Sequence, residues 1–345
     1  MSICVGVDIG GTKIAASAVR ADGTVLARGR RETPARDADQ IVLAVADVVR
    51  ELKDQARAEG EDVVAVGAAC AGFIDRSGET VLFAPNLAWR DEPLKARLEA
   101  QIPLPVVLEN DANAAAWGEF RFGAGRGQTD MVMVTLGTGV GGGVIVAGQL
   151  LRGAHGMGAE VGHLRVVPDG HRCGCGNKGC WEMYASGSAL VREARQLVAG
   201  GSPHAGVLAD RCGRDPSRLT GIMVTEVAGT GDPAAVELLE DVGRWTGEGL
   251  ASLTAILDPS ILVVGGGVSA AGDLVLEPAR AAFGRHLSGR GHRTRVPIVL
   301  AELGNDAGMI GVADLAAAGV NPAGGPALAS SVRAAGSLDP AAPSE

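Results

Sequence analysis

The same pattern opens each half of this chain: an apolar segment runs into a glycine-rich turn, and the chain then turns back. Residues 3–9 lead into Asp8-Ile-Gly-Gly-Thr-Lys13, and residues 130–136 lead into Gly137-Thr-Gly-Val-Gly-Gly. A short apolar run bounded by glycines is typical of a buried strand. The repeat therefore predicts a duplicated unit of three strands followed by alternating helices and strands, with a cleft between two α/β halves.

Hydrophobic periodicity indicates the elements of both halves. Asp22-Gly23 marks a hairpin between a strand that ends near Arg20 and a strand over 24–30. Apolar residues recur with helical spacing over 37–59, and further helices are expected over 233–256, 268–286 and 305–318. The other expected strands are 63–67, 105–108, 130–136, 144–147, 261–264 and 297–301, which leaves 137–143 as a turn.

Composition narrows the class of protein. The 345 residues are 46% hydrophobic and 21% charged, which is the balance of a globular chain of about two domains. The net charge of -9 disfavours nucleic acid as a partner, and every apolar run is far shorter than the ~18 residues of a membrane-spanning helix. Only seven residues precede Asp8, too few for a signal peptide, so we expect a cytoplasmic protein.

The expected domain organisation has three parts. Residues 1–110 together with 305–320 form a small α/β domain, and residues 111–304 form a larger one. Residues 321–345 are rich in Pro, Ala and Ser and have little to bury, which predicts a disordered tail.

Three glycine-rich turns are candidates for nucleotide binding. In the first, glycines let backbone N–H groups face an anion, a threonine adds a hydroxyl, and Asp8 could hold a divalent metal through water. An ordinary hairpin with glycines at positive φ is the alternative there. The second turn, 137–143, fits the pattern G-x-G-x-x-G, but the helix that follows this pattern in a dinucleotide-binding site is absent. The third turn, 265–267, lies between a strand and a helix, which suits the adenosine part of a nucleotide. The candidate residues are Asp8, Gly10, Gly11, Thr12, Lys13, Gly137, Thr138, Gly139, Gly265, Gly266 and Gly267.

A polar cluster follows the strand at 105–108. Asn110, Asp111 and Asn113 lie where this strand passes into a helix. Asn and Asp are favoured N-caps, so one of the three is expected to cap the helix. Capping needs only one residue, and a carboxylate at the cleft could accept a proton from a substrate hydroxyl.

A histidine and three cysteines have the spacing of a metal site. His163, Cys173, Cys175 and Cys180 follow the pattern His-x9-Cys-x-Cys-x4-Cys. One imidazole and three thiolates complete a tetrahedral shell with no open position, which predicts one structural Zn²⁺. A redox pair is the weaker alternative, because the Cys-x-x-Cys spacing is absent. The remaining cysteines, Cys4, Cys70 and Cys212, are expected in the core.

Two glutamates flank this metal loop, which spans 160–182. A solvated surface is the default for Glu160 and Glu182. A rigid loop between them could instead aim both carboxylates at a polyol. His163 could then bind zinc through one ring nitrogen and a substrate hydroxyl through the other.

Five motifs, in order over residues 3–318, together resemble the ROK family of repressors and sugar kinases, and within it the glucokinases of actinobacteria. They are Asp8-Ile-Gly-Gly-Thr-Lys13, Glu109-Asn-Asp-Ala-Asn113, Gly137-Thr-Gly-Val-Gly-Gly, Glu160-Val-Gly-His163 and Cys173-Gly-Cys-Gly-Asn-Lys-Gly-Cys-Trp-Glu182. The resemblance implies the ribonuclease H-like (actin/hexokinase) fold, in which sugar and ATP meet in an interdomain cleft.

The resemblance also implies a reaction, in which ATP with Mg²⁺ phosphorylates the 6-hydroxyl of D-glucose. Asp111 matches the family's catalytic base, and the histidine and three cysteines match its zinc ligands. The three glycine turns match its phosphate and adenosine segments. The implied sugar-binding set is Gly72, Asn110, Asp111, Glu160, His163 and Glu182. One departure is Gly158-Ala159 before Glu160, where the family often has Ala-Gly.

Other functions within this fold stay open. Mannose, fructose and N-acetyl amino sugars differ from glucose by single substituents, and polyphosphate could replace ATP. A sugar-sensing regulator is a further alternative, although ROK repressors carry a DNA-binding domain ahead of the first phosphate turn. An actin-like ATPase would not need the zinc cluster. We expect glucose and ATP as ligands, a homo-oligomer (dimer or tetramer), and neither nucleic acid nor membrane as partner.

Overall fold

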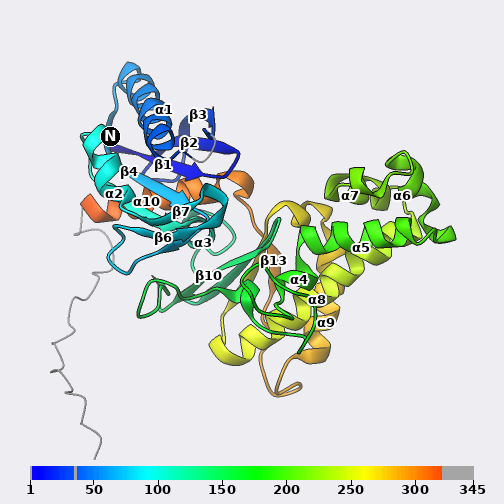
Figure 1. Ribbon diagram of the computed structural model, residues 1–345. Coiled ribbons are helices and arrows are strands. Elements are labelled where there is room, and N and C mark those ends of the chain that lie inside the picture. Colours follow the sequence, from blue (N-terminus) through cyan, green and yellow to red (C-terminus); the bar gives the residue numbers. More distant parts are fainter. Residues whose placement is uncertain (1, 35–36, 321–345) are drawn as a thin grey trace, which may run out of the picture.

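Two five-stranded sheets with the same strand order form the frame of the protein (Figure 1). The computed structural model describes residues 2–34 and 37–320. The first sheet, in the order β3-β2-β1-β4-β8, contains β1 (Ser2–Ile9), β2 (Lys13–Arg20), β3 (Val25–Glu32), β4 (Asp62–Cys70) and β8 (Val106–Asn110). The second, in the order β11-β10-β9-β12-β13, contains β9 (Met131–Leu136), β10 (Val140–Val146), β11 (Gln149–Leu150), β12 (Ile261–Gly265) and β13 (Ile298–Leu300).

Strand directions also repeat between the two sheets. In each, the first three strands pair antiparallel and the last two run parallel to the first strand. Parallel pairing needs a crossover connection, which the intervening helices supply. The predicted duplication of a mixed α/β unit is therefore confirmed.

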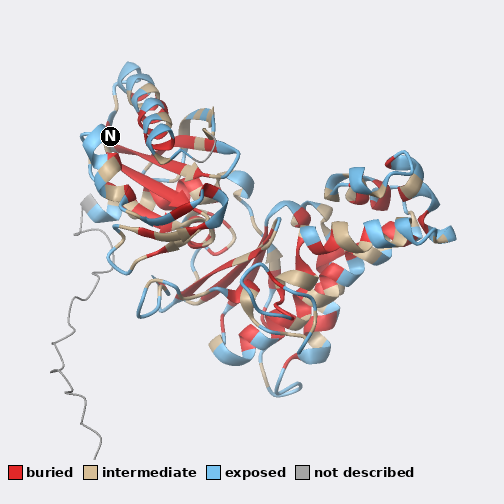
Figure 2. Ribbon diagram, viewed as in Figure 1, coloured by how far each residue is buried: buried red, intermediate tan, exposed pale blue. Residues whose placement is uncertain are grey.

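Helix α1 (Ala38–Ala58) covers the first sheet with an apolar stripe. Ile41, Val45 and Leu52 are fully buried on this face, and burial of each such side chain contributes about 1.5–3 kcal/mol. The Asp37 side chain accepts hydrogen bonds from the first-turn N–H groups and thereby caps the helix. Strands β1, β2 and β4 of this sheet are mostly buried, whereas the edge strand β3 and the outer face of α1 are partly exposed (Figure 2).

Two helices connect the sheets by crossing over. Helix α3 (Asp111–Phe122) leaves β8 of the first sheet and packs against β10 of the second, while α10 (Ala307–Val320) leaves the second sheet and packs against β1 and β4. They cross closely, since a Cβ at Gly311 would lie 1.8 Å from the Ala114 carbonyl oxygen. The domain limits that we expect at 110/111 and 304/305 stay a prediction, and both coincide with these crossovers.

The remaining elements surround the sheets. A small sheet of β5 (Phe73–Ile74), β6 (Val81–Ala84) and β7 (Trp89–Glu92) precedes α2 (Leu94–Gln101). The second half carries α4 (Glu182–Ala185), α5 (Gly187–Ala199), α6 (Gly206–Arg211), α7 (Gly221–Gly229), α8 (Pro233–Leu257) and α9 (Asp273–His286). Helices α6 and α7 lie at the edge of the molecule farthest from the first sheet (Figure 1).

Two predicted boundaries are wrong by four residues or more. The turn expected over 137–143 ends at Gly139, and Gly141 to Gly143 belong to β10. Gly141 and Gly143 let α3 approach the sheet, because a Cβ at Gly143 would lie 2.3 Å from the Ala116 Cβ. The helix expected from 268 begins at Asp273, because Gly272 has a φ of 60° and interrupts it.

Other expectations have clear outcomes. Cys4, Cys70 and Cys212 are buried, as predicted. No helix in the described ranges is both long and apolar enough to cross a membrane. The predicted tail, 321–345, lies outside the described residues.

Candidate functional site

The junction between β8 and α3 presents a carboxylate at a helix N-terminus. Asn110 is the N-cap, and its Oδ1 accepts hydrogen bonds from the N–H groups of Ala112 and Asn113, each at 3.0 Å. This confirms that one residue of the polar cluster caps the helix. Asp111 is the first helical residue, and its Oδ1 accepts a hydrogen bond from the Ala112 N–H at 2.9 Å.

Asp8 and Asp111 influence each other across the edge of the first sheet. They lie at the carboxyl ends of β1 and β8, which run in the same direction with β4 between them. Burial raises the pKa of Asp111. Burial, and then the charge of Asp111, raise the pKa of Asp8 to about 6, opposed by Lys13. Carboxylates placed so near each other bind protons or cations more readily than isolated ones.

Gly72, two residues beyond β4, joins this site through its backbone. Its carbonyl oxygen accepts a hydrogen bond from Asn110 Nδ2 at 3.2 Å. A Cβ at this position would lie 2.7 Å from the Phe83 carbonyl oxygen. Glycine is therefore required for the close approach of the backbone to β6.

The first glycine turn is a tight, exposed hairpin. The Gly10 N–H donates to the Lys13 carbonyl at 3.0 Å, and Thr33 Oγ1 donates to the Gly10 carbonyl at 2.6 Å. Neither Gly10 nor Gly11 has a positive φ. The alternative, that this is an ordinary hairpin whose glycines are needed for a positive φ, is therefore wrong. A Cβ at Gly11 would instead lie 3.1 Å from the carbonyl oxygen of Asn86.

The second and third turns lie together. The Gly137 carbonyl accepts a hydrogen bond from the Gly187 N–H at 2.8 Å, which ties the second turn to the start of α5. In the third turn Gly266 has a φ of 86°, and a Cβ there would lie 2.6 Å from the Leu136 nitrogen. The backbone at the end of β9 is thus in contact with the turn after β12, as two parts of one binding surface require.

His163 and the three cysteines form one cluster, as predicted. Their ligand atoms all lie within 4.8 Å of one another. Cys175 Sγ and Cys180 Sγ are 3.6 Å apart, and His163 Nδ1 is 3.7 Å from Cys173 Sγ. A tetrahedral Zn²⁺ with Zn–S bonds of about 2.3 Å separates its sulfurs by about 3.8 Å, so these residues fit a structural zinc. If the metal binds Nδ1 of His163, the Nε2 of that ring remains available to another partner.

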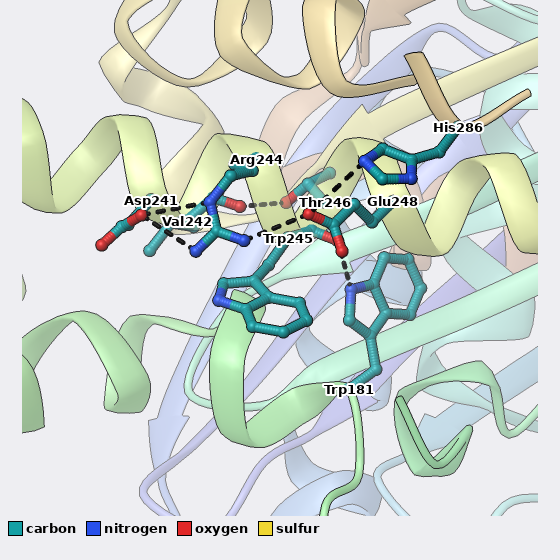
Figure 3. Close-up of polar contacts among 8 residues, drawn as sticks. All are labelled: Trp181, Asp241, Val242, Arg244, Trp245, Thr246, Glu248 and His286. Atoms are coloured by element: carbon teal, nitrogen blue, oxygen red, sulfur yellow. Dashed lines mark hydrogen bonds and ion pairs between the residues drawn. The ribbon is translucent and has the colours of Figure 1, made fainter. Parts of the chain in front are cut away.

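Trp181 fixes the end of the metal loop to the second core. It stands between Cys180 and Glu182, is fully buried, and its Nε1 donates to the Trp245 carbonyl at 2.8 Å (Figure 3). A Cβ at Gly249 of α8 would lie 2.1 Å from the indole ring. The contacts of Trp181 with α8 therefore fix the positions of its two neighbours, the metal ligand Cys180 and Glu182.

Glu182 connects the metal cluster to the second glycine turn. Its Oε2 accepts a hydrogen bond from the Val140 N–H at 3.2 Å, and Cys173 Sγ lies 3.6 Å from Oε1. A Cβ at Gly139 would lie 2.1 Å from Oε2. Glycine at 139 thus makes room for this carboxylate.

Glu160 belongs to the same electrostatic group. The residue is exposed, as the default for a glutamate predicts. Partial desolvation still raises its pKa most strongly, His163 lowers it, and Asp111 and Glu182 raise it. The structure therefore brings Asp111, where the first sheet passes into α3, near Glu160, His163 and Glu182 from the second half. Ala159, at the departure from the family pattern, has a φ of 66°, a region that favours glycine.

Glu109 and Arg152 contribute to the site, although the sequence assigns neither of them a role. Glu109 is a buried carboxylate that forms an ion pair with Arg152 at 2.7 Å. The sequence signal for Glu109 is an acidic residue inside an apolar strand, but nothing in the sequence pairs it with Arg152.

Two cavities lie away from the site. One of about 560 Å³ lies beside Tyr184 and Trp245, and one of about 300 Å³ lies between α1 and residues 101–104.

Known proteins resemble this chain over most of its length. The sequence pattern of the ROK family matches residues 4–318. A glucokinase of Streptomyces coelicolor is 48% identical over 316 residues, covering 92% of this chain and 98% of that protein. The structure of a ROK family glucokinase from Streptomyces griseus in complex with glucose and AMPPNP has 50% identity and a TM-score of 0.82, covering 91% of this chain and 99% of that one. A ROK hexokinase from Thermus thermophilus has 34% identity and a TM-score of 0.77, with coverages of 93% and 99%.

Proposed function

This chain belongs to the ROK family, and we propose that it is a glucokinase that transfers the γ-phosphoryl group of ATP to the 6-hydroxyl of D-glucose. The observation that supports this reaction best is the grouping of Asp111 with Glu160, His163 and Glu182. Three acceptor-rich side chains around a helix-terminal carboxylate suit a polyol that must lose one proton. Glucose and ATP are accordingly the ligands.

Asp111 is the proposed base. Its carboxylate would take the proton of the sugar hydroxyl while the new bond forms between that oxygen and the γ-phosphorus and the bond to the β-phosphate oxygen breaks, releasing ADP. The raised pKa of Asp111 brings it closer to the pH at which a general base works best. The hydrogen bond from Ala112 holds one carboxylate oxygen and leaves the other for substrate.

The remaining polar groups would orient the sugar. Asn110, Glu160, His163 and Glu182 would hydrogen-bond the ring hydroxyls, with the backbone of Gly72 beside them. Positioning alone supplies a large share of the rate in phosphoryl transfer, because the protein forms no covalent bond to the substrate. The anchoring of Glu182 to α8 and to Val140 gives this set the rigidity it needs.

The phosphates would lie on the glycine turns. Backbone N–H groups of 10–12 and 137–139 would face the β- and γ-phosphates, with Thr12, Lys13 and Thr138 beside them. Residues 265–267 would contact the adenosine. When bound, Mg²⁺ neutralises phosphate charge, and Asp8 is the residue that would hold it through water. The structural zinc would act only through the loop that carries Glu160 and Glu182.

We further propose that the domains 1–110 with 305–320 and 111–304 close over the substrates, which would exclude water. A cytoplasmic location and assembly as a homo-oligomer, either dimer or tetramer, are part of the same proposal.

One experiment tests the proposed function against its alternatives. A coupled assay crosses glucose, mannose, fructose and N-acetylglucosamine with ATP and polyphosphate as donors. We expect the highest kcat/KM for glucose with ATP. A higher value for another sugar would reassign the chain within the family, and binding of sugar without turnover would favour a sugar-sensing regulator.

A further inference from the structure

A buried carboxylate behind the catalytic junction joins the two halves of the protein. Glu109 Oε1 accepts hydrogen bonds from the Asn110 N–H and from Asn113 Nδ2, each at 3.0 Å. Its Oε2 accepts a hydrogen bond from Arg152 Nε at 2.7 Å. The side chain of Glu109 is only 5% exposed, so this carboxylate depends on these three donors rather than on water.

The arginine comes from the loop that leads to Glu160. Arg152 follows β11, and its carbonyl oxygen accepts a hydrogen bond from the Gly158 N–H at 2.9 Å. A Cβ at Gly158 would lie 3.0 Å from that carbonyl oxygen, so the two ends of the 152–158 loop segment approach each other closely. The backbone of Arg152 thereby lies next to the residues that immediately precede Glu160.

We propose that Arg152 is a positioning residue for phosphoryl transfer. Through Glu109 it holds Asn110 and Asp111, at the end of the first sheet, in a defined position relative to Glu160, on the loop from the second. This inference rests on the proposed function and adds to it a residue that does not touch the substrate.

Loss of the arginine would release the junction. Glu109 pairs with no other cation in the described part of the chain, so without Arg152 a buried charge would remain unpaired. It would then turn toward water or take up a proton, and its bonds to Asn110 and Asn113 would weaken. The Asn113 side chain has little else to hold it, because its buried Oδ1 has no partner among the described residues. A shift of about 1 Å at a reacting group can cost about 10²-fold in rate.

A matched control exists in the same loop. Arg76 Nη1 donates to the Ala154 carbonyl at 3.1 Å, so it also links the first half to this loop, yet it has no bond to Glu109. Figure 1 shows the loop beyond β10 beside the small sheet of β5, β6 and β7. Arg76 follows β5 in the chain. The variant Arg76→Met therefore removes a tether without leaving a buried charge.

The test compares Arg152→Met, Arg152→Lys, Arg76→Met and the double variant Glu109→Gln/Arg152→Met by steady-state kinetics. For Arg152→Met we expect kcat to fall about 10²-fold with KM for ATP unchanged, and Arg152→Lys to recover part of the loss. The double variant should regain at least about 10-fold in kcat, because the neutral amide introduced by Glu109→Gln needs no cation and its oxygen still accepts the two hydrogen bonds. Arg76→Met should stay within about threefold of wild type.

Several outcomes would overturn the proposal: equal losses for Arg76→Met and Arg152→Met, near-wild-type kcat in folded Arg152→Met, or no recovery in the double variant. Calorimetric titration with glucose tests the positioning role without turnover. We expect about tenfold weaker binding for Arg152→Met and near-wild-type binding for Arg76→Met. A wild-type protein that binds glucose but does not phosphorylate it would refute the proposed function while leaving this comparison of affinities decisive for Arg152.

Discussion

Replacing Asp8 with asparagine should make the protein more stable, although the carboxylate is part of the proposed ATP site. In the folded protein the pKa of Asp8 is raised from 3.8 to about 6 by burial and by Asp111. The folded state therefore binds a proton more tightly than the unfolded state does, and the stability that this contributes is present at low pH and lost as the pH rises toward 6. Asn is a neutral group of the same shape and removes the cost of the charge.

The magnitude follows from the pKa difference. The rise in the pKa of Asp8 from 3.8 to about 6 costs about 3 kcal/mol of stability at pH 7.5, and about half of that at pH 5. Since unfolding entropy is about 2.1 cal/mol/K per residue, this corresponds to a rise in Tm of about 4 °C if the whole chain unfolds together. The measurement is thermal unfolding of Asp8→Asn and wild type without Mg²⁺ or nucleotide at both pH values. Phosphorylation of glucose should fall in the same variant.

The control is an aspartate with the opposite shift. Asp22 lies in the exposed hairpin between β2 and β3, and its pKa is lowered because its carboxylate accepts a hydrogen bond from the Thr24 N–H. Its contribution to stability is therefore present at neutral pH and lost on acidification. Asp22→Asn should lower Tm slightly at pH 7.5 and less at pH 4. A loss of stability in Asp8→Asn at pH 7.5, or a gain that does not shrink at pH 5, would refute the reasoning about Asp8.

Four further predictions concern the proposed site. Asp111→Asn should lower kcat by roughly 10²–10⁴ because it removes the base; wild-type turnover by folded variant would exclude that role. Purified protein should contain about one zinc per chain, and active enzyme without zinc would contradict this. Cys175→Ala should lower Tm and activity together, because the loop loses a metal ligand. The family resemblance implies that Glu182 contacts the 2-hydroxyl, so Glu182→Gln should reduce kcat/KM for glucose by about 5- to 150-fold and for 2-deoxyglucose by less, since an unpaired buried group costs about 1–3 kcal/mol. Equal losses for both sugars would place Glu182 against a hydroxyl other than the 2-hydroxyl. Ala159→Gly should stabilise the protein by about 0.5–1 kcal/mol without changing KM for glucose, because it relieves a positive φ in the loop; a lower Tm would show that the loop is not strained there.

Local patterns in the sequence were sufficient for the duplicated architecture. Apolar runs of strand length, the hairpin at Asp22-Gly23 and the helical stripe of 38–58 all express interactions between residues near in the chain. The zinc cluster belongs to the same class, because short spacings within one loop bring the cysteines together whatever surrounds them. The capping role of Asn110 followed from its side-chain chemistry at a strand–helix boundary.

Errors arose where one element packs on another. The glycines of 141–143 suggested a long turn, but Gly141 and Gly143 let α3 approach β10 and Gly142 makes room for Val161. These contacts join elements that no periodicity relates. Gly139 shows the same limit, since its lack of a Cβ serves Glu182, which is its neighbour in space and not in sequence.

Electrostatics at the site depends on tertiary structure alone. Sequence spacing identified Asp8 and Asp111 as separate candidates, but only the parallel alignment of β1, β4 and β8 brings their charges close enough to raise the pKa of Asp8. Likewise, Glu109 and Arg152 were both visible in the sequence, and only the return of the loop after β11 to the first sheet makes them an ion pair. Coulombic and hydrogen-bonding energies depend on distance through space and on burial, and neither is encoded in the local order of residues.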